Sequence, residues 1–208
     1  FMLLSGIVLV ITTIDGMLSR YDGLVLFLVF IGFMYYNYRL QTSIFAEAGS
    51  KADRESISDM KQEFVFFILG ALCVVAGSRI LIDAGIEIAQ WLGVPEMIIG
   101  LTLVAVGTSL PEFITAVSAT LKGHQDMSIG NILGANTMDI AMILGVSSQI
   151  RSLPILPQSI RYDFPVMLFI MVMLIFFGAT GQKIERWEGA VILCSYVAYV
   201  AGLLIWYN

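Results

Sequence analysis

Charged residues are scarce in this sequence. Asp, Glu, Lys and Arg make up 13% of its 208 residues, whereas 58% are hydrophobic and the mean hydropathy is +0.88. Soluble domains carry about 25% charged residues. The composition therefore predicts an integral membrane protein surrounded by the lipid bilayer. Because the Lys and Arg residues form no basic stripe, we expect no nucleic acid partner.

Histidine and cysteine are also scarce. His124 is the only histidine and lies in a short polar loop, which excludes a histidine-based metal cluster. Cys73 and Cys194 each lie inside an apolar run, so we interpret them as small buried hydrophobic side chains rather than a disulfide or a metal pair. The chain begins with an apolar run that has neither a basic n-region nor a cleavage site. This start excludes a signal peptide, and we expect the numbering to begin inside a transmembrane helix of a longer protein.

Long apolar runs are abundant. A transmembrane helix needs about 20 mostly apolar residues, and helical periodicity and run length both argue against strands. We predict an all-α, polytopic membrane protein with about seven spans, the first truncated, at 1–14, 23–40, 64–80, 95–121, 127–150, 163–181 and 188–207. The polar segment 41–63 is the plausible linker between residues 1–40 and 64–208. Beyond residue 77 we expect the helix to leave the bilayer and continue along the interface, with Trp91 as an interfacial aromatic.

The basic residues of the loops predict an orientation. If the 41–63 linker is cytoplasmic, Lys and Arg are more numerous on its side of the membrane, with Arg39, Lys51, Arg54, Lys61, Lys122, Lys183 and Arg186 against Arg20, Arg151 and Arg161. Cytoplasmic loops carry the excess of Lys and Arg. We therefore predict a multi-pass protein of the cell membrane with a cytoplasmic linker and an external C-terminus.

The sequence contains an internal echo. DGMLSRYDGLVLFLVFIGF, from Asp15, aligns with GQKIERWEGAVILCSYVAY, from Gly181, at a constant offset of 166 residues. An odd number of predicted spans separates the two copies, so the matching turns fall on opposite faces of the membrane. Inverted repeats of this kind are typical of transporters, whose substrate site lies at the repeat interface near the bilayer midplane.

Two of the predicted helices carry polar stripes. On the helix over 95–121, small and polar residues recur every three or four positions and form one face, which consists of Ala105, Thr108, Ser109, Glu112, Thr115 and Ala116. On the helix over 127–150, Asn131, Ala135 and Asp139 form a stripe, with Asn136 beside it. Gly130 and Gly134 form a G-x-x-x-G face that predicts close approach of another helix.

Glu112 and Asp139 are acids deep inside apolar spans, and neither span contains a Lys or Arg to pair with them. An acid at the bilayer centre costs about 2.5–3.5 kcal/mol on insertion scales. One alternative is a protonated carboxyl that hydrogen-bonds a neighbouring helix. Because hydroxyl and amide oxygens flank both acids, the pattern favours a site for a hard cation such as Ca²⁺. Pro111 has no N–H, so the Gly107 carbonyl loses its helical partner, and freed carbonyls near 105–108 can face a cavity.

Residues 107–140, GTSLPEFITAVSATLKGHQDMSIGNILGANTMDI, resemble one α-repeat of the calcium/cation antiporter superfamily, and in particular the prokaryotic sodium/calcium exchangers. The signal is GTS-x-PE followed by GN-x-x-GAN-x-x-D, and the resemblance extends over essentially the whole chain. Members of the superfamily have ten transmembrane helices in two inverted halves, each with one α-repeat. The resemblance implies that 1–40 holds the last two helices of the first half, and that 64–208 is the second half with its α-repeat at about 95–150.

The resemblance implies a secondary antiporter, not an enzyme, that exchanges Ca²⁺ for Na⁺ by alternating access and needs no organic cofactor. It implies that Glu112 is a central Ca²⁺ ligand, that Thr108 and Ser109 serve both ions, that Ala105 contributes its carbonyl, and that Asp139 lies near the central sites. Pro111, Gly107, Asn136, Asn131 and Ala135 are implied as supporting residues. The long helix that contains 64–92 is implied to slide between the two states.

Ala135 stands where the family often has serine, which removes a hydroxyl expected beside a sodium site. Antiport coupled to protons or to another divalent cation is therefore an alternative. The first α-repeat is also missing from these residues, so the expected partner is the first half of the same protein or another copy of this chain. We expect the 208 residues alone neither to bind calcium tightly nor to transport it. An intramembrane protease and a non-transporting scaffold are further alternatives, although hydroxyl-rich stripes are unlike a water-activating dyad.

Overall fold

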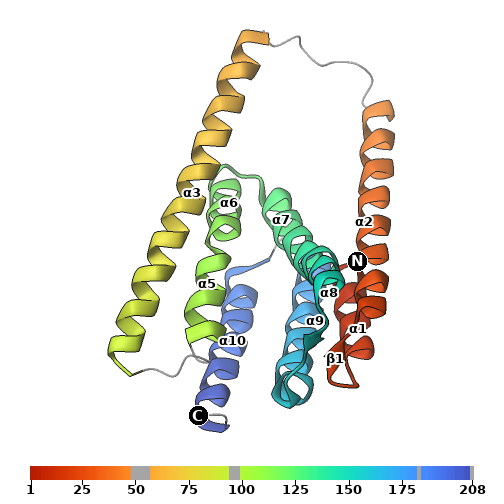
Figure 1. Cartoon of the computed structure of the whole chain (residues 1–208). Helices are drawn as coiled ribbons and strands as arrows, with labels where there is room; N and C mark the ends of the chain where they lie inside the picture. The colour runs from red at the N-terminus through yellow and green to blue at the C-terminus, as the bar shows by residue number, and fades with distance from the viewer. Residues whose placement is uncertain (48–56, 94–98, 182–183, 207–208) are drawn as a thin grey trace.

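The structure is a computed structural model, and it describes residues 1–47, 57–93, 99–181 and 184–206 (Figure 1). Helices make up almost all of this part of the chain, which confirms the predicted all-α class. In chain order they are α1 (Met2–Thr12), α2 (Arg20–Glu47), α3 (Ile57–Trp91), η1 (Gly100–Val104), α5 (Ala105–Thr108), α6 (Leu110–Leu121), α7 (Gln125–Met138), η2 (Asp139–Leu144), α8 (Gly145–Ile150), η3 (Ser159–Asp163), α9 (Phe164–Gly181) and α10 (Arg186–Trp206). The three η segments are π-helical, with a wider turn than an α-helix.

The lengths of these helices fit a polytopic membrane protein. Within the described residues, five helices are long and apolar enough to cross a membrane, or six if the bent pair 102–108 and 110–121 forms one span. α1 is a shorter apolar helix that lies within the predicted first span at 1–14. Large apolar side chains such as Phe66 and Leu193 are exposed on the outside of the bundle. Such a surface is stable only in contact with lipid or with another apolar surface.

α3 differs from its prediction. It runs without interruption from Ile57 to Trp91, and Figure 1 shows it as one straight helix along the side of the bundle. A segment that turned to lie along the interface would require a bend, so the predicted interfacial continuation beyond residue 77 is wrong. Arg79, Asp83 and Glu87, whose charges suggested the turn, lie on the exposed surface of the same helix.

Two further details differ from the sequence-based expectations. The strands β1 (Met17–Leu18) and β2 (Leu153–Pro154) form a short antiparallel ladder, which the helical periodicity did not predict. The ladder joins the α1–α2 turn, where Gly16 has φ +85°, to the segment after α8. Cys73 and Cys194 are free cysteines, but they are exposed on the bundle surface rather than buried.

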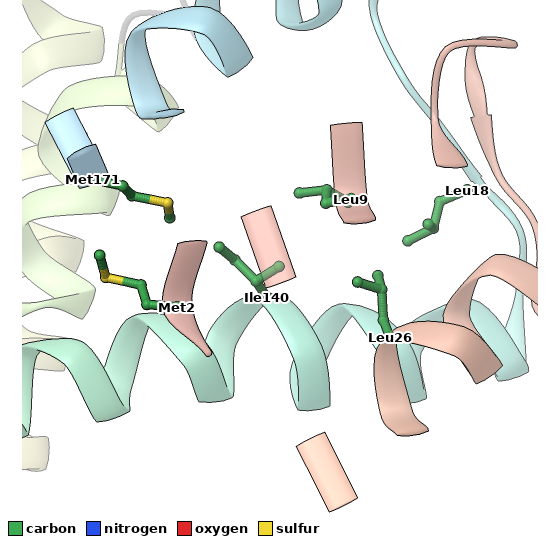
Figure 2. Close-up of a cluster of buried hydrophobic side chains, with 6 residues drawn as sticks. All are labelled: Met2, Leu9, Leu18, Leu26, Ile140 and Met171. Atoms are coloured by element: carbon green, nitrogen blue, oxygen red, sulfur yellow. The ribbon is translucent and has the colours of Figure 1, made fainter. Parts of the chain in front are cut away.

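The buried core lies beside the second polar helix. Met2 and Leu9 of α1, Leu26 of α2 and Met171 of α9 surround Ile140 of η2 (Figure 2). Ile140 and its neighbour Ala141 are buried. This packing anchors the first turn of η2, where Asp139 lies.

The two copies of the internal echo begin their helices in a similar way in the structure. Ser19 N–H donates to Asp22 Oδ2 at 2.9 Å as α2 begins, and Glu185 N–H donates to Glu188 Oε2 at 2.7 Å as α10 begins. In both helices, the carboxylate of an acid in the first turn accepts a hydrogen bond from the backbone N–H of the residue before the helix. The two helices begin at opposite ends of the bundle (Figure 1). The two matching turns therefore lie at opposite ends of the described bundle, as the predicted inversion requires.

Candidate ion-binding site

The first polar helix is broken at the GTSLPE motif. α5 ends at Thr108, α6 begins at Leu110, and the two segments are bent by 50°. The predicted kink is confirmed, and its cause is Pro111 in the first turn of α6, which has no N–H to continue the helical ladder. As a result, Glu112 lies in the first turn of a helix that has changed direction.

The second polar helix is irregular at the corresponding acid. The α-helical ladder of α7 ends at Met138, and the π-helical segment η2 starts at Asp139. Short π-helical segments inside α-helices occur frequently at functional sites. This change could not be predicted from the residues, because the apolar periodicity continues through it.

Between these two irregular helices lies an open cavity of about 760 Å³. Six of the predicted site residues line it: Thr108, Ser109, Glu112, Ala135, Asn136 and Asp139. The rest of its wall is apolar. It consists of Ala116, which belongs to the predicted polar face, and of residues that were not singled out from the sequence: Phe113, Ile132, Met138, Ile140, Ile143 and Leu144. The cavity is thus a small polar patch inside an apolar wall, with no Lys or Arg among its lining residues.

The two acids meet in this cavity. The carboxylates of Glu112 and Asp139 interact electrostatically, and like charges repel. Glu112 Oε2 is buried, and no group in the described residues hydrogen-bonds it. A buried carboxylate oxygen without a partner is costly. Two repelling acids, one of them with an unsatisfied oxygen, form a site that a cation would stabilise.

Neutral oxygens complete the polar patch. The Thr108 hydroxyl donates its proton to the carbonyls of Val104 and Ala105, at 3.0 and 3.1 Å, so its lone pairs remain available as acceptors. Asn136 Nδ2 donates to the Ile132 carbonyl at 2.8 Å, which leaves the amide oxygen for a ligand. The patch therefore contains carboxylate, hydroxyl and amide oxygens, the ligand types that Ca²⁺ and Na⁺ accept.

Four predicted site residues lie outside the lining of the cavity. The Ala105 carbonyl accepts hydrogen bonds from Ser109 N–H at 3.3 Å and from the Thr108 hydroxyl. Gly107 is buried against Ile82 of α3, where any Cβ would overlap the Ile82 side chain. Pro111 contributes to the site indirectly, because it causes the bend that orients α6. Asn131 donates to the Glu112 carbonyl at 3.2 Å.

The cavity offers several oxygens to a cation. The two carboxylates, two hydroxyls and one amide in its lining carry seven side-chain oxygens, within the six to eight that Ca²⁺ takes. Among the residues that the structure describes, no three Asp, Glu, His or Cys side chains form a potential metal cluster. The G-x-x-x-G face of the same region is also open, because a Cβ at Gly130 or Gly134 would meet nothing within 4 Å. The close helix approach predicted there is absent from the described part of the chain.

Comparison with known proteins identifies the family. The family model described as "Sodium/calcium exchanger protein" matches residues 63–205, which is more than two thirds of the chain. The chain belongs to the sodium/calcium exchanger family. The matched region contains both polar helices, the cavity between them and α10, and it confirms the resemblance to the exchangers.

Several known membrane proteins are similar to the chain in sequence, and one solved structure is also similar in fold. The sodium/calcium exchanger MaX1 of Methanosarcina acetivorans is 40% identical over 136 residues, which are 65% of this chain and 39% of that protein. The inner membrane protein YrbG of Escherichia coli is 27% identical over 99% of this chain and 65% of its own length. The solved structure of the sodium-calcium exchanger NCX_Mj, soaked with zero Na⁺ and Ca²⁺, has a TM-score of 0.72 and 32% identity, covering 96% of this chain and 62% of that chain. The chain thus spans between 39% and 65% of these proteins.

Proposed function

We propose that the protein is a secondary antiporter that exchanges Ca²⁺ for Na⁺ across the cell membrane by alternating access. Glu112 is the central Ca²⁺ ligand, Asp139 is the second charged ligand, and Thr108, Ser109 and Asn136 supply neutral oxygens. The observation that carries this proposal is the buried oxygen of Glu112 that has no partner in the described residues, in a cavity shared with a second acid and no base. The names of the relatives MaX1 and NCX_Mj support the choice of ions.

Competition for the same carboxylates couples the two ions in this proposal. A divalent ion neutralises both acids at once, whereas a monovalent ion leaves one negative charge unless a second one binds. Ca²⁺ and Na⁺ therefore exclude each other from Glu112 and its neighbours. Either ion, once bound, neutralises the carboxylates of the site. The change of access therefore takes place with Ca²⁺ or with Na⁺ bound, but not when the site is empty.

The experiment that tests this function is calcium uptake by vesicles that contain the complete protein and carry an outward sodium gradient. Glu112→Gln keeps the size of the side chain but removes the charge, and we expect it to abolish sodium-driven uptake. Glu87→Gln makes the same change on the exposed surface of α3 and is the matched control, with uptake like that of the wild type. Normal uptake by Glu112→Gln would refute the assigned role. Uptake driven by a pH gradient but not by sodium would assign the coupling to protons.

We propose further that a second α-repeat, from the first half of the same protein or from another copy, completes the ion shell. Two observations support this proposal. The Gly130 and Gly134 face is open, and at Gly189 the described residues do not cover α10 as they cover its counterpart α2 at Gly23. A Cβ at Gly23 of α2 would overlap Ser148 of α8, whereas one at the equivalent Gly189 would meet nothing within 4 Å.

The proposed orientation places the predicted 41–63 linker, both ends of which belong to α2 and α3 in the structure, in the cytoplasm and the C-terminus outside. The described helices support the relative placement, because α10 ends at the opposite end of the bundle from the end of α2 (Figure 1). The choice of the cytoplasmic side rests on the excess of Lys and Arg in the loops at the α2 end.

A further inference from the structure

Asn131 connects the two helices that carry the acids. Its amide Nδ2 donates to the backbone carbonyl of Glu112 at 3.2 Å, across 19 positions of sequence. Within the described residues, this is the side-chain hydrogen bond that joins α6 to α7. The sequence pattern placed Asn131 in line with Ala135 and Asp139, but its side chain turns toward α6 and is absent from the cavity lining.

Other polar side chains of these two helices bond differently. They donate to carbonyls three or four residues earlier in their own helix, as Thr115 does to Pro111, Thr120 to Ala116, Asn136 to Ile132 and Thr137 to Leu133. Such bonds satisfy a hydroxyl or amide in an apolar environment but say nothing about how two helices are placed. The Asn131 bond fixes one helix relative to the other.

The Asn131 hydrogen bond lies where the regular helical backbone does little to set the relative positions of the two acids. α6 starts again after the 50° bend, so the ladder of α5 does not dictate its direction. The acid on the second helix lies at the start of the irregular segment η2. The carboxylates of Glu112 and Asp139 also repel each other, which tends to separate the two helices when no cation is present. A tie at the Glu112 backbone opposes this separation.

We propose that Asn131 is a positioning residue for the cation site: it holds Glu112 at a set distance from Asp139 before the ion arrives. A preorganised site loses less free energy in ordering its ligands, so the ion binds more tightly. This inference rests on the proposed function, because it requires that a cation binds between these acids.

Ion affinity separates positioning from a merely structural role. A bond that only stabilises the fold contributes equally to the ion-free and the ion-bound protein, so its loss lowers the melting temperature at every ion concentration and leaves Kd unchanged. A bond that presets the site also changes Kd, because it favours the geometry that the ion selects. The calcium dependence of the melting temperature measures both quantities.

The test uses the complete protein in detergent, titrated with Ca²⁺ alone. Asn131→Leu keeps the branched shape of the side chain but removes the donor, and we expect it to raise the Kd for Ca²⁺ by roughly five- to tenfold, the loss typical of one hydrogen bond. Asn131→Gln keeps an amide on a longer stem, and we expect part of the affinity to return. Asn37→Leu is the control, since Asn37 Nδ2 donates to Phe33 of its own helix, α2, at 2.8 Å, and we expect a lower melting temperature with an unchanged Kd.

The outcomes distinguish the two proposals. If Asn131→Leu and Asn131→Gln both bind Ca²⁺ like the wild type while Glu112→Gln does not, the positioning role is overturned and the proposed function stands. If Glu112→Gln also keeps wild-type calcium dependence, the proposed function itself fails. Should Asn131→Leu not fold, Asn131→Gln decides: an unchanged Kd overturns the positioning role, and a raised Kd supports it.

Discussion

At the scale of single residues, the candidate site contains an acidic side chain that has no basic partner among the residues lining the cavity. Glu112 lies in an apolar wall with one buried, unsatisfied oxygen, and Asp139 adds a second negative charge to the same cavity. A cation bound between the two acids, as proposed above, would compensate such a pair in a hydrophobic span. The bend at Pro111 brings Glu112 to the cavity, whereas Gly107 allows α5 to lie directly on α3.

Asp139→Asn is the residue-scale prediction. It removes one of two negative charges but keeps the shape and an oxygen ligand. A divalent ion interacts with each carboxylate charge twice as strongly as a monovalent ion does. We therefore expect Ca²⁺ affinity to fall by at least about tenfold, and Na⁺ affinity by less. Titration of the melting temperature with each ion measures this shift. An equal loss for both ions would show that Asp139 acts through structure rather than charge.

Much of the site at this scale could be predicted from the sequence. Glu112, Asp139, Thr108, Ser109, Asn136 and Ala135 all line the cavity, because acids without basic partners are costly in apolar helices and occur mainly where they face a cavity or an ion. The direction of Asn131 could not be predicted, since helical spacing gives the face of an ideal helix, and both polar helices here depart from ideal geometry. The apolar lining, including Phe113 and Ile143, was missed because such residues resemble ordinary lipid-facing ones.

At the scale of helices, two irregularities and several close contacts determine where the polar residues lie. Pro111 marks the first irregularity in the sequence, whereas the π-helical start of η2 at Asp139 carries no compositional signal. The continuous α3 was also missed, because Arg79, Asp83 and Glu87 suggested an interface. Charges on the exposed face of a helix do not end it. The β1–β2 ladder, with two residues in each strand, is too short to produce a period.

The paired glycines give the helix-scale prediction. Gly23→Ala places a Cβ onto Ser148 and 2.8 Å from the Gly145 carbonyl, so we expect a loss of about 1–3 kcal/mol, as for other overpacked sites. If a helix like α8 covers α10 in the complete protein, Gly189→Ala should cost a similar amount. Melting of the complete protein with each variant measures both.

Gly70→Ala is the control for this pair, because a Cβ at Gly70 meets nothing within 4 Å. There the change from Gly to Ala should stabilise the helix by up to about 1 kcal/mol. If Gly189→Ala behaves like Gly70→Ala, the proposed cover of α10 is contradicted.

At the scale of the whole molecule, the two matching helix starts describe an inverted pair. A similar cap begins α2 and α10 at opposite ends of the bundle. α8 packs against α2 at Gly23, whereas a Cβ at Gly189 of α10 would meet nothing within 4 Å in the described structure. The offset of 166 residues was visible in the sequence because a capping acid and its glycine fall at fixed positions. The sequence did not show which helix packs against each of the two copies, because packing depends on residues far apart in the chain.

The proposed function depends on Ca²⁺ binding between Glu112 and Asp139. The most direct test is long-wavelength anomalous diffraction from crystals of the complete protein grown with calcium and without sodium. We predict an anomalous calcium peak in the cavity between α6 and η2, about 2.3–2.6 Å from a carboxylate oxygen of Glu112. Raising the sodium concentration should remove the peak. A calcium peak elsewhere in the membrane-spanning helices, with this cavity empty, would contradict the proposed site.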